Sequence, residues 1–418
     1  MKNSSMKMII NKKYTLALKN IGYLGVLKIC NSIFPFVSYP YLIKTLGSEQ
    51  YGEIIYYEGI AIFFAVFVSY GFNLSATRDI SNCRGDINKV SYEFYNVLIT
   101  KLIILSPVYV LYILIGYIFF NDNLKLYMLC SGPLISEFLF PLWFYQGMEK
   151  LKNSSILTVM FRFLLLLSIL FLIKEKNDNI DYAYLLMMYH ISYGSVTILY
   201  IIFKFKIWSY IPNNIKIKKT LRSGFSVFLS TMLTAVKDRL NVIIVGSFLG
   251  HSEVVLFDFS SKLLSAISLP QNIIINSFFS TISKEKSIHL FKKITFYINV
   301  LNTPIFIISC IFIWFFSSLF FTYNNHELIA MMIIMLAVLP LGVSSSISRL
   351  YLLPFGHDAI LARITFINSS LYLIIILSYL YISKELSIVN FSILILVTYF
   401  IELLIRVFAY LKVSDCEN

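Results

Sequence analysis

Long apolar stretches separated by short polar loops alternate along the whole chain. A transmembrane helix needs roughly 20 apolar residues, because the hydrocarbon core is about 30 Å thick and each helical residue rises about 1.5 Å. The approximate bounds of twelve such stretches are 18–43, 54–72, 95–120, 126–146, 154–173, 182–204, 224–249, 254–278, 293–321, 328–346, 359–383 and 389–411. The pattern predicts an all-α integral membrane protein of about twelve transmembrane helices.

Composition agrees with this fold class. The 418 residues are 58% hydrophobic and only 14% charged, which is more apolar surface than a soluble protein of this length uses. The Lys-rich N-terminus resembles a signal peptide, but the apolar stretch that follows is long enough to span and no small-residue cleavage site comes after it. We therefore expect an uncleaved first helix.

The net charge of +13 is concentrated in alternate loops rather than spread over one face. Lys and Arg collect in cytoplasmic loops of membrane proteins, so this distribution predicts that both termini are cytoplasmic. The same distribution argues against nucleic acid as a partner. The predicted cytoplasmic side carries, among others, Lys2, Arg78, Arg84, Lys150, Lys216, Lys286, Arg349 and Lys412.

A short internal repeat suggests two halves. Leu46-Gly47-Ser48-Glu49-Gln50-Tyr51 closes the first predicted span, and Leu249-Gly250-His251-Ser252-Glu253-Val254 closes the seventh. Parallel repeats are a recurrent plan in transporters, with the substrate site between the halves. We expect a six-helix bundle at 1–205, a basic cytoplasmic linker at 206–222 and a second six-helix bundle at 223–418.

Polar residues recur at helical spacing within two apolar stretches. The seventh predicted span carries Ser223, Ser226, Ser230, Thr234, Lys237 and Asn241, and the eighth carries Asp258, Ser261, Lys262, Ser265, Ser268, Asn272 and Asn276. Charged side chains at bilayer depth are costly unless they face water or a partner, so these stripes favour a hydrophilic cavity. The alternative is that the hydroxyls merely pack helices closely or bond to their own backbone.

Three consecutive charges stand near the middle of the seventh predicted span. Lys237 is roughly 13 residues from the start of its helix, hence roughly 20 Å deep. Asp238 and Arg239 point about 100° and 200° away from it, so the three cannot all face one cavity. One arrangement has Lys237 in the cavity and the other two in interhelix ion pairs, and the sequence leaves this choice open. Asp258 and Lys262 are spaced for an i, i+4 salt bridge.

The first half of the chain has a similar stripe in its first predicted span: Gly25, Lys28, Asn31, Pro35 and Ser38. Further charges at bilayer depth are Glu58, Lys101 and Arg162, although Arg162 is close enough to one end to snorkel to the interface. The excess of Lys and Arg predicts a central cationic cavity, which suits an anionic ligand such as phosphate or diphosphate. His190, in the sixth predicted span, is interpreted as a packed, hydrogen-bonded side chain.

Motifs for catalysis, nucleotides and metals are missing from the sequence. GxxxxGK[ST], HExxH and GxSxG do not occur, and the five cysteines include no CxxC pair. We therefore expect no metal, no cofactor and no intrinsic ATP hydrolysis.

Several segments resemble a known family. The N-terminal ones are Pro40-Tyr41-Leu42-Ile43-Lys44-Thr45-Leu46-Gly47, Tyr51-Gly52 and Tyr70-Gly71-Phe72-Asn73-Leu74-Ser75-Ala76-Thr77-Arg78. The later ones are Pro141-Leu142-Trp143-Phe144-Tyr145-Gln146-Gly147, Asp238-Arg239 with Ile243, Ile244 and Gly246, and Arg349-Leu350-Tyr351-Leu352-Leu353-Pro354-Phe355-Gly356. Together they resemble Wzx-type polysaccharide repeat-unit flippases of the multidrug/oligosaccharidyl-lipid/polysaccharide (MOP) superfamily.

The resemblance implies a multi-pass protein of the bacterial inner membrane that is a transporter and not an enzyme. It would move undecaprenyl-diphosphate-linked oligosaccharide repeat units to the periplasmic leaflet for O-antigen or capsule synthesis, by alternating access coupled to an ion gradient. A polysaccharide polymerase and a chain-length regulator are the protein partners that it implies. The candidate substrate-binding residues are Lys28, Asn31, Arg162, Lys237, Arg239, Asn241 and Lys262, and the candidate ion-coupling residues are Glu58, Asp238 and Asp258.

Two other functions are alternatives to a flippase. A multidrug cation antiporter of the same superfamily would need acidic residues around its ligand, which the excess of Lys and Arg disfavours. A membrane polymerase that joins the same repeat units would need a large periplasmic loop with catalytic Arg or His, and the predicted outer loops are all short.

Overall fold

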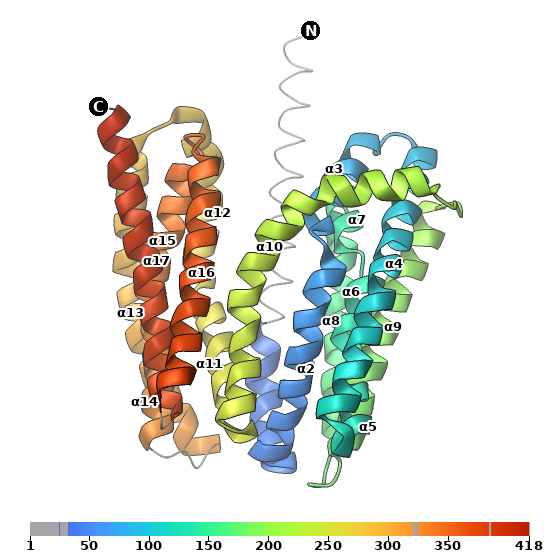
Figure 1. Ribbon diagram of the computed structural model, residues 1–418, viewed down its shortest axis with the longest axis horizontal. Helices are drawn as coiled ribbons and strands as arrows, with labels where there is room; N and C mark the ends of the chain where they lie inside the picture. The colour runs from blue at the N-terminus through green and yellow to red at the C-terminus, as the bar shows by residue number, and fades with distance from the viewer. Residues whose placement is uncertain (1–24, 26–31, 321–324, 384–385, 418) are drawn as a thin grey trace. The chain divides into compact units, whose positions relative to one another are not determined.

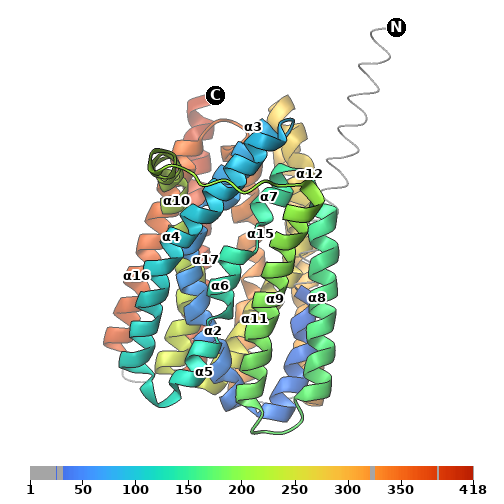
Figure 2. The same cartoon turned by 90° about the vertical axis from the view of Figure 1, so that its right-hand side faces the viewer.

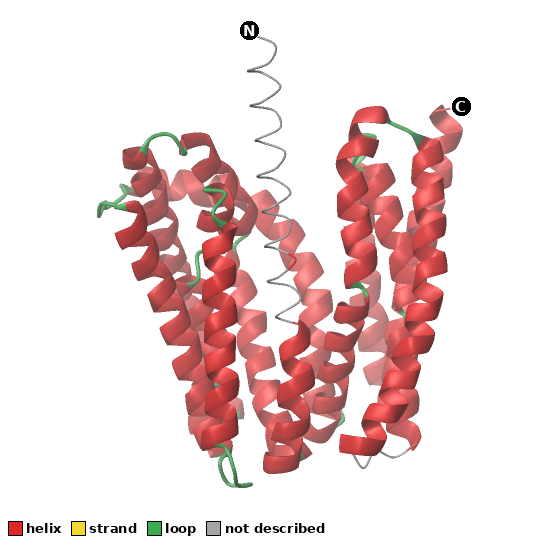
Figure 3. Cartoon of the chain, turned by 180° about the vertical axis from the view of Figure 1, so that it is seen from behind, coloured by secondary structure: helices red, strands yellow, loops and turns green. Residues whose placement is uncertain are grey.

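The computed structural model describes residues 25, 32–320, 325–383 and 386–417, and all regular structure within these residues is helical (Figures 1 and 3). After a first helix over residues 32–46 come α2 (Ser48–Ser69), α3 (Phe72–Cys83), α4 (Ile87–Phe119), η1 (Asn121–Asn123), α5 (Leu124–Leu129), α6 (Gly132–Leu139), α7 (Leu142–Gly147), α8 (Leu151–Leu172) and α9 (Asn179–Phe205). The second half holds α10 (Asn214–Phe248), α11 (His251–Ile267), α12 (Leu269–Glu285), α13 (Ile288–Phe320), α14 (Asn325–Leu336), α15 (Val338–Ser346), η2 (Ile347–Leu352), α16 (Asp358–Ile382) and α17 (Ile388–Glu417).

Nine helical stretches in the described residues are long and apolar enough to cross a membrane, so the multi-pass, all-α prediction is confirmed. The predicted number of twelve transmembrane helices is not confirmed. The first predicted span lies partly outside the described residues. The seventh and eighth correspond to α10 and to α11 with α12, which are helical but not among the nine. In α10 the consecutive charges Lys237, Asp238 and Arg239 lower the hydropathy.

Prolines divide three of the predicted spans into shorter helices. A proline lacks an N–H and clashes with the carbonyl four residues earlier, so a helix tends to end there. Pro141 follows the end of α6 at Leu139, Pro270 stands at the first turn of α12, and Pro340 lies four residues after the end of α14 at Leu336. The structure divides these three spans at the α6–α7, α11–α12 and α14–α15 boundaries.

The described chain forms two compact units. Unit 1 comprises Met1–Tyr41 and Tyr57–Met232, and unit 2 comprises Leu42–Tyr56 and Leu233–Asn418. All three boundaries fall inside helices, because the first helix, α2 and α10 each contribute residues to both units. The division at 205 and 223 that the repeat suggested stays a prediction, and so does the central cavity.

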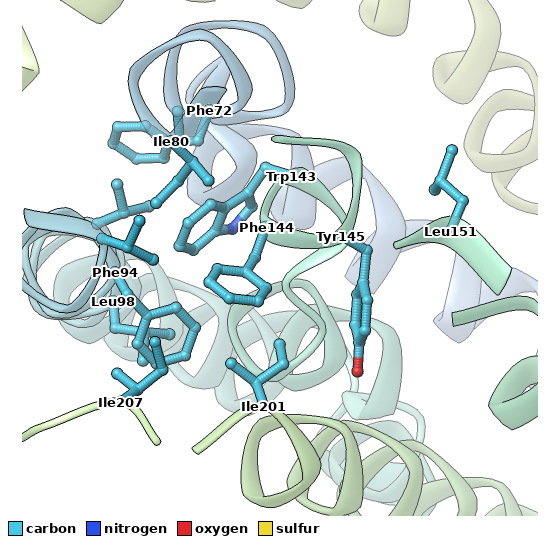
Figure 4. Close-up of a cluster of buried hydrophobic side chains, with 13 residues drawn as sticks. Phe72, Ile80, Phe94, Leu98, Trp143, Phe144, Tyr145, Leu151, Ile201 and Ile207 are labelled. Atoms are coloured by element: carbon cyan, nitrogen blue, oxygen red, sulfur yellow. The ribbon is translucent and has the colours of Figure 1, made fainter. Parts of the chain in front are cut away.

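In unit 1, α6 and α8 pack on α9, and α3 packs on α7 (Figure 2). The break at Pro141 lets α7 turn its aromatic residues inward. Trp143 and Phe144 are fully buried against Phe94 of α4 and Phe72 of α3, with ring centroids 5.7 Å apart for Phe94–Trp143 and 5.2 Å for Phe94–Phe144 (Figure 4). This cluster fixes the loops at one end of the unit.

In unit 2, α14 packs on α17 and α13 on α15. The second buried cluster is built around the π-helical segment η2, where Leu350, Tyr351 and Leu352 are inaccessible to solvent. A π-helical turn rotates successive side chains differently from an α-helix and is frequent at functional sites. Here the π-helical turn buries Leu350, Tyr351 and Leu352, whereas the preceding residue, Arg349, stays exposed.

The two turns of the sequence repeat lie together in unit 2. Gly47 and Gly250 both have positive φ, 85° and 111°, and each immediately precedes a helix. A Cβ on Gly52 would lie 1.8 Å from the carbonyl oxygen of His251, so the start of α2 packs directly on the start of α11. Tyr56 hydrogen-bonds Ser247 at 2.8 Å across the same contact. The repeated motif therefore produces two equivalent turns that touch.

Candidate functional site

A buried charge network lies inside unit 2. Lys237 of α10 donates from Nζ to Oε2 of Glu402 on α17 at 2.5 Å, and each residue is only 8% exposed. Arg406 stands one turn after Glu402 on the same face of α17 and pairs with its other oxygen, Oε1, at 2.6 Å. One carboxylate thus separates two cations.

Neutral polar groups complete the network. Asn368 of α16 donates to Oε2 of Glu402 at 2.8 Å, and Arg406 donates to the hydroxyl of Ser344 on α15 at 2.7 Å. The ammonium of Lys237 also lies 4.9 Å above the centre of the Tyr399 ring. Buried charges are tolerated only with good partners, and this set supplies them to both oxygens of the carboxylate.

The network holds more positive than negative charge. Among the described residues, two cations share the single carboxylate of Glu402, and no hydrogen-bond partner for the buried Nε of Arg406 is found there. Arg349, exposed on η2, adds a further positive charge to the electrostatic environment of Arg406 and donates to Oδ1 of Asn272 at 3.2 Å. This arrangement attracts anions to unit 2 and repels cations.

Asn241 extends the contact of α10 with the rest of unit 2. Its Oδ1 accepts a short hydrogen bond from the hydroxyl of Tyr372 on α16, and its Nδ2 donates to the backbone carbonyl of Lys237 at 3.3 Å. Lys237 and Asn241 were expected to line a cavity. In the structure Lys237 contacts Glu402 of α17 and Asn241 contacts Tyr372 of α16, and their place in a cavity stays a prediction.

The other predicted residues of the second half are placed as follows. Arg239 is exposed. Asp258 and Lys262 form the predicted i, i+4 salt bridge at 2.5 Å, and that spacing argument is confirmed. The side chain of Asp238 lies outside the described part of the structure. So do Lys28 and Asn31 of the first half.

In unit 1, the predicted charges have distinct surroundings. The guanidinium of Arg162 lies 5.1 Å from the centre of the Phe34 ring, and its buried Nε has no hydrogen-bond partner in the part of the chain that the structure describes. Glu58 of α2 faces His190 of α9 at 3.8 Å, between Oε1 and Nε2. His190 is packed tightly, since a Cβ on Gly132 would be 2.7 Å from its ring, but no described residue hydrogen-bonds to its Nδ1.

Sequence reasoning missed the most connected member of the site. Glu402 and Arg406 lie within the predicted span 389–411, and their i, i+4 spacing in an apolar segment was a usable signal. Nothing in the sequence paired Glu402 with Lys237, which is 165 positions away. Within the described residues, no group of three metal-ligating side chains occurs.

The amino-acid sequence is similar to that of a known protein family. The family model described as "Polysaccharide biosynthesis protein" matches residues 17–284. The chain is 24% identical over 283 residues to the "Putative O-antigen transporter" of Escherichia coli (strain K12), covering 66% of this chain and 68% of that one. It is 26% identical over 369 residues to the protein of the same name from Shigella dysenteriae, covering 85% and 91%.

A solved structure establishes the fold. An inward-facing multidrug resistance MATE family transporter of the MOP superfamily superposes with a TM-score of 0.61 at 13% identity, over 92% of this chain and 99% of that one. The chain thus has a MATE-like membrane transporter fold. By the extent of the family match, it belongs to the polysaccharide biosynthesis protein family, whose members resemble Wzx-type transporters.

Proposed function

We propose that this protein is a flippase that moves undecaprenyl-diphosphate-linked oligosaccharide repeat units across the bacterial inner membrane, from the cytoplasmic to the periplasmic leaflet. The observation that carries the proposal is the match to an O-antigen transporter over 91% of that protein's length. The excess of buried positive charge in unit 2 supports an anionic substrate and disfavours the cationic ligands of a multidrug antiporter.

The sugar and diphosphate would pass through a polar route while the polyprenyl chain stays in lipid. Alternating access exposes such a route first to one side and then to the other. Arg162, Arg239 and Lys262 are proposed to contact the diphosphate, together with Lys28 and Asn31. Bidentate hydrogen bonds from Arg to phosphate oxygens supply both affinity and orientation.

Lys237 and Asn241 take a different proposed role. A diphosphate contacts Lys237 only if Glu402 releases it, because the two are held at 2.5 Å in a buried site. We therefore assign Lys237 and Asn241 as positioning residues that hold α10 against α16 and α17. The direct substrate contact fits residues with accessible ends, such as Arg239.

The coupling step is proposed at the acidic residues within the bilayer. Glu58 has an imidazole 3.8 Å away, a distance from which a proton can be shared through a small movement or one water molecule. Asp258 is already neutralised by Lys262, and Asp238 completes the set of candidates. Asp258 would bind sodium or a proton only after Lys262 had moved away.

Purified protein in vesicles tests this function directly. A lipid-linked oligosaccharide with a fluorescent sugar is placed in both leaflets, and a membrane-impermeant reagent reports its movement. We expect the protein to raise the exchange rate, Arg239→Ala to lower it at least tenfold, and the exposed control Lys125→Ala in α5 to leave it unchanged. Transport of cationic dyes without exchange of the lipid would support the antiporter instead.

The coupling assignment needs a separate measurement. Exchange is followed with and without an imposed proton or sodium gradient, for the wild type and for Glu58→Gln. A rate that ignores both gradients contradicts ion coupling while leaving the flippase proposal intact. A gradient response that survives in Glu58→Gln removes Glu58 from the coupling site.

A further inference from the structure

The segment Lys206–Arg222 joins α9 to the first turns of α10 within unit 1. It lies outside the nine candidate spans, and the start of α10 crosses the end of the unit near α4 (Figures 1 and 2). The basic loops of the same predicted side include Arg84 and Lys150. The sequence pattern predicts only that the segment Lys206–Arg222 is a basic linker.

One side of this segment is fixed to α4. The amide of Trp208 donates to the hydroxyl of Ser91 at 3.2 Å, and Nζ of Lys216 pairs with Glu93 at 2.6 Å. Asn96 donates to the hydroxyl of Thr220 at 2.8 Å. These bonds hold three points along the segment to successive turns of one helix.

Apolar contacts reinforce the same side. Ile207 and Ile217 are 5% and 8% exposed, and Pro212 between them is also buried. The Tyr210 ring lies 4.4 Å from that of Tyr92, centre to centre. A segment held by three hydrogen-bonded contacts and these buried residues has a defined orientation, so its opposite side is defined too.

That opposite side combines bare apolar residues with cations. Trp208, Ile211 and Ile215 are 68%, 87% and 78% exposed. Ile215, Lys218, Lys219 and Arg222 follow at spacings of three, one and three residues, which places them on one face of the helix, and all four are exposed. Lys216, Ile217 and Thr220 occupy the face that packs on α4.

This pattern matches the boundary between lipid headgroups and acyl chains. Trp and Ile dip below the headgroups, and Lys and Arg reach anionic phosphates beside them. In water alone, side chains such as Ile211 and Ile215 would be left without a packing partner. The segment exposes four cations, Lys206, Lys218, Lys219 and Arg222, and clusters of four to eight cations near a membrane surface are a recognised signature of anionic-lipid binding.

We propose that the outer face of Lys206–Arg222 is a binding site for the headgroups of anionic phospholipids. This goes beyond the proposed flippase function and does not depend on it. The groups that bind are the cations of Lys218, Lys219 and Arg222, with Trp208, Ile211 and Ile215 inserted beside them. Because α10 is one continuous helix from Asn214 to Phe248, lipid binding at its start fixes the direction from which α10 enters the membrane.

Trp208 provides a reporter. The protein is reconstituted in vesicles of zwitterionic lipid alone and of zwitterionic lipid with 30% phosphatidylglycerol, and the fluorescence of a Trp208→Phe variant is subtracted from that of the wild type. The buried Trp143 is present in both proteins, so its emission cancels in the difference. We expect the Trp208 emission to shift to shorter wavelength in the anionic vesicles and to move back toward the zwitterionic value in 0.5 M salt.

Two variants and one competitor make the test decisive. Replacement of Lys218, Lys219 and Arg222 by Gln should abolish the lipid-dependent shift, while the loop control Lys174→Gln with Lys176→Gln should keep it. An equal shift in both vesicle types, or one that survives the triple replacement, overturns the proposal. So does full reversal by 1 mM inorganic phosphate, which would identify a site for free phosphate rather than for a lipid surface.

Discussion

Lys237 and Glu402 form a 2.5 Å ion pair inside unit 2, and Arg406 pairs with the second oxygen of the same carboxylate. Removing one partner of a buried pair costs about 3–5 kcal/mol, because the other charge is left uncompensated. Removing Lys237 and removing the charge of Glu402 have unequal consequences here. Loss of Lys237 leaves Glu402 paired with Arg406, whereas loss of the charge on Glu402 leaves two cations without a carboxylate.

We therefore expect Glu402→Gln to destabilise the protein more than Lys237→Met does. Thermal unfolding of the detergent-purified protein measures both, with Lys125→Met as the exposed control. The double variant should be no less stable than Glu402→Gln alone, since it removes one of the two stranded cations. Equal losses for the two single variants would show that Arg406 does not compensate Glu402.

Lys101 supports a second prediction in unit 1. Its Nζ lies 2.7 Å from the backbone carbonyl of Glu137 and 2.9 Å from the carboxylate of the same residue. That carbonyl is the one that Pro141, four residues later, leaves without a helical N–H. Lys101→Met should cost about 1–3 kcal/mol for the stranded carbonyl, in addition to the lost ion pair.

A second substitution separates the two contributions. Pro141→Ala restores an N–H four residues after Glu137, so the Lys101→Met/Pro141→Ala pair should recover part of the lost stability. Glu137→Gln, which keeps the carbonyl contact, should be milder than Lys101→Met. If Pro141→Ala lowers the unfolding temperature equally with and without Lys101, the carbonyl contact is not what Lys101 supplies.

The spacing rules accounted for local relationships and failed for distant ones. The Asp258–Lys262 pair and the helical character of the stripes follow from i, i+4 geometry, and both are present in the structure. The orientation of Lys237 does not follow, because its partner Glu402 comes from α17, and a helical wheel shows only which residues share a face. The neighbouring helix that covers this face is decided by tertiary packing. The packing of distant helices cannot be derived from the spacing of residues in a single sequence.

Glu253, at the start of α11, predicts a dependence of stability on pH. Burial, together with the nearby Glu327, raises the pKa of its carboxyl from 4.5 to about 7, and Oε2 accepts no hydrogen bond from any described residue. The folded protein therefore binds more protons than the unfolded chain between about pH 4.5 and 7. The stability that this group contributes is complete below that window and is lost as the pH rises through it.

The unfolding temperature of the wild type should fall relative to that of Glu253→Gln as the pH is raised from 5 to 8. The variant carries a neutral amide at every pH, so it removes this one titration. Glu175→Gln, in the exposed loop before α9, is the matched control and should follow the wild type. A constant difference between the wild type and Glu253→Gln across the range would contradict the raised pKa.

The contact between the two repeated turns leads to the sharpest steric prediction. A Cβ on Gly52 would lie 1.8 Å from the carbonyl oxygen and 2.5 Å from the carbonyl carbon of His251, which are backbone atoms that cannot rotate away. Overpacking of a filled site typically costs about 1–3 kcal/mol, and a contact with rigid backbone should reach or exceed the upper end. Gly85 offers a control in the same chain, since a Cβ there meets nothing within 4 Å.

Gly52→Ala should lower the unfolding temperature and the yield of folded protein, whereas Gly85→Ala should leave both unchanged. Neither position has positive φ, and helix propensity favours Ala over Gly within α2, so it cannot explain a loss of stability in Gly52→Ala. A Gly52→Ala protein as stable as Gly85→Ala would mean that the start of α2 does not rest on the start of α11. The equivalence of the two turns would then be a similarity of sequence without a shared interface.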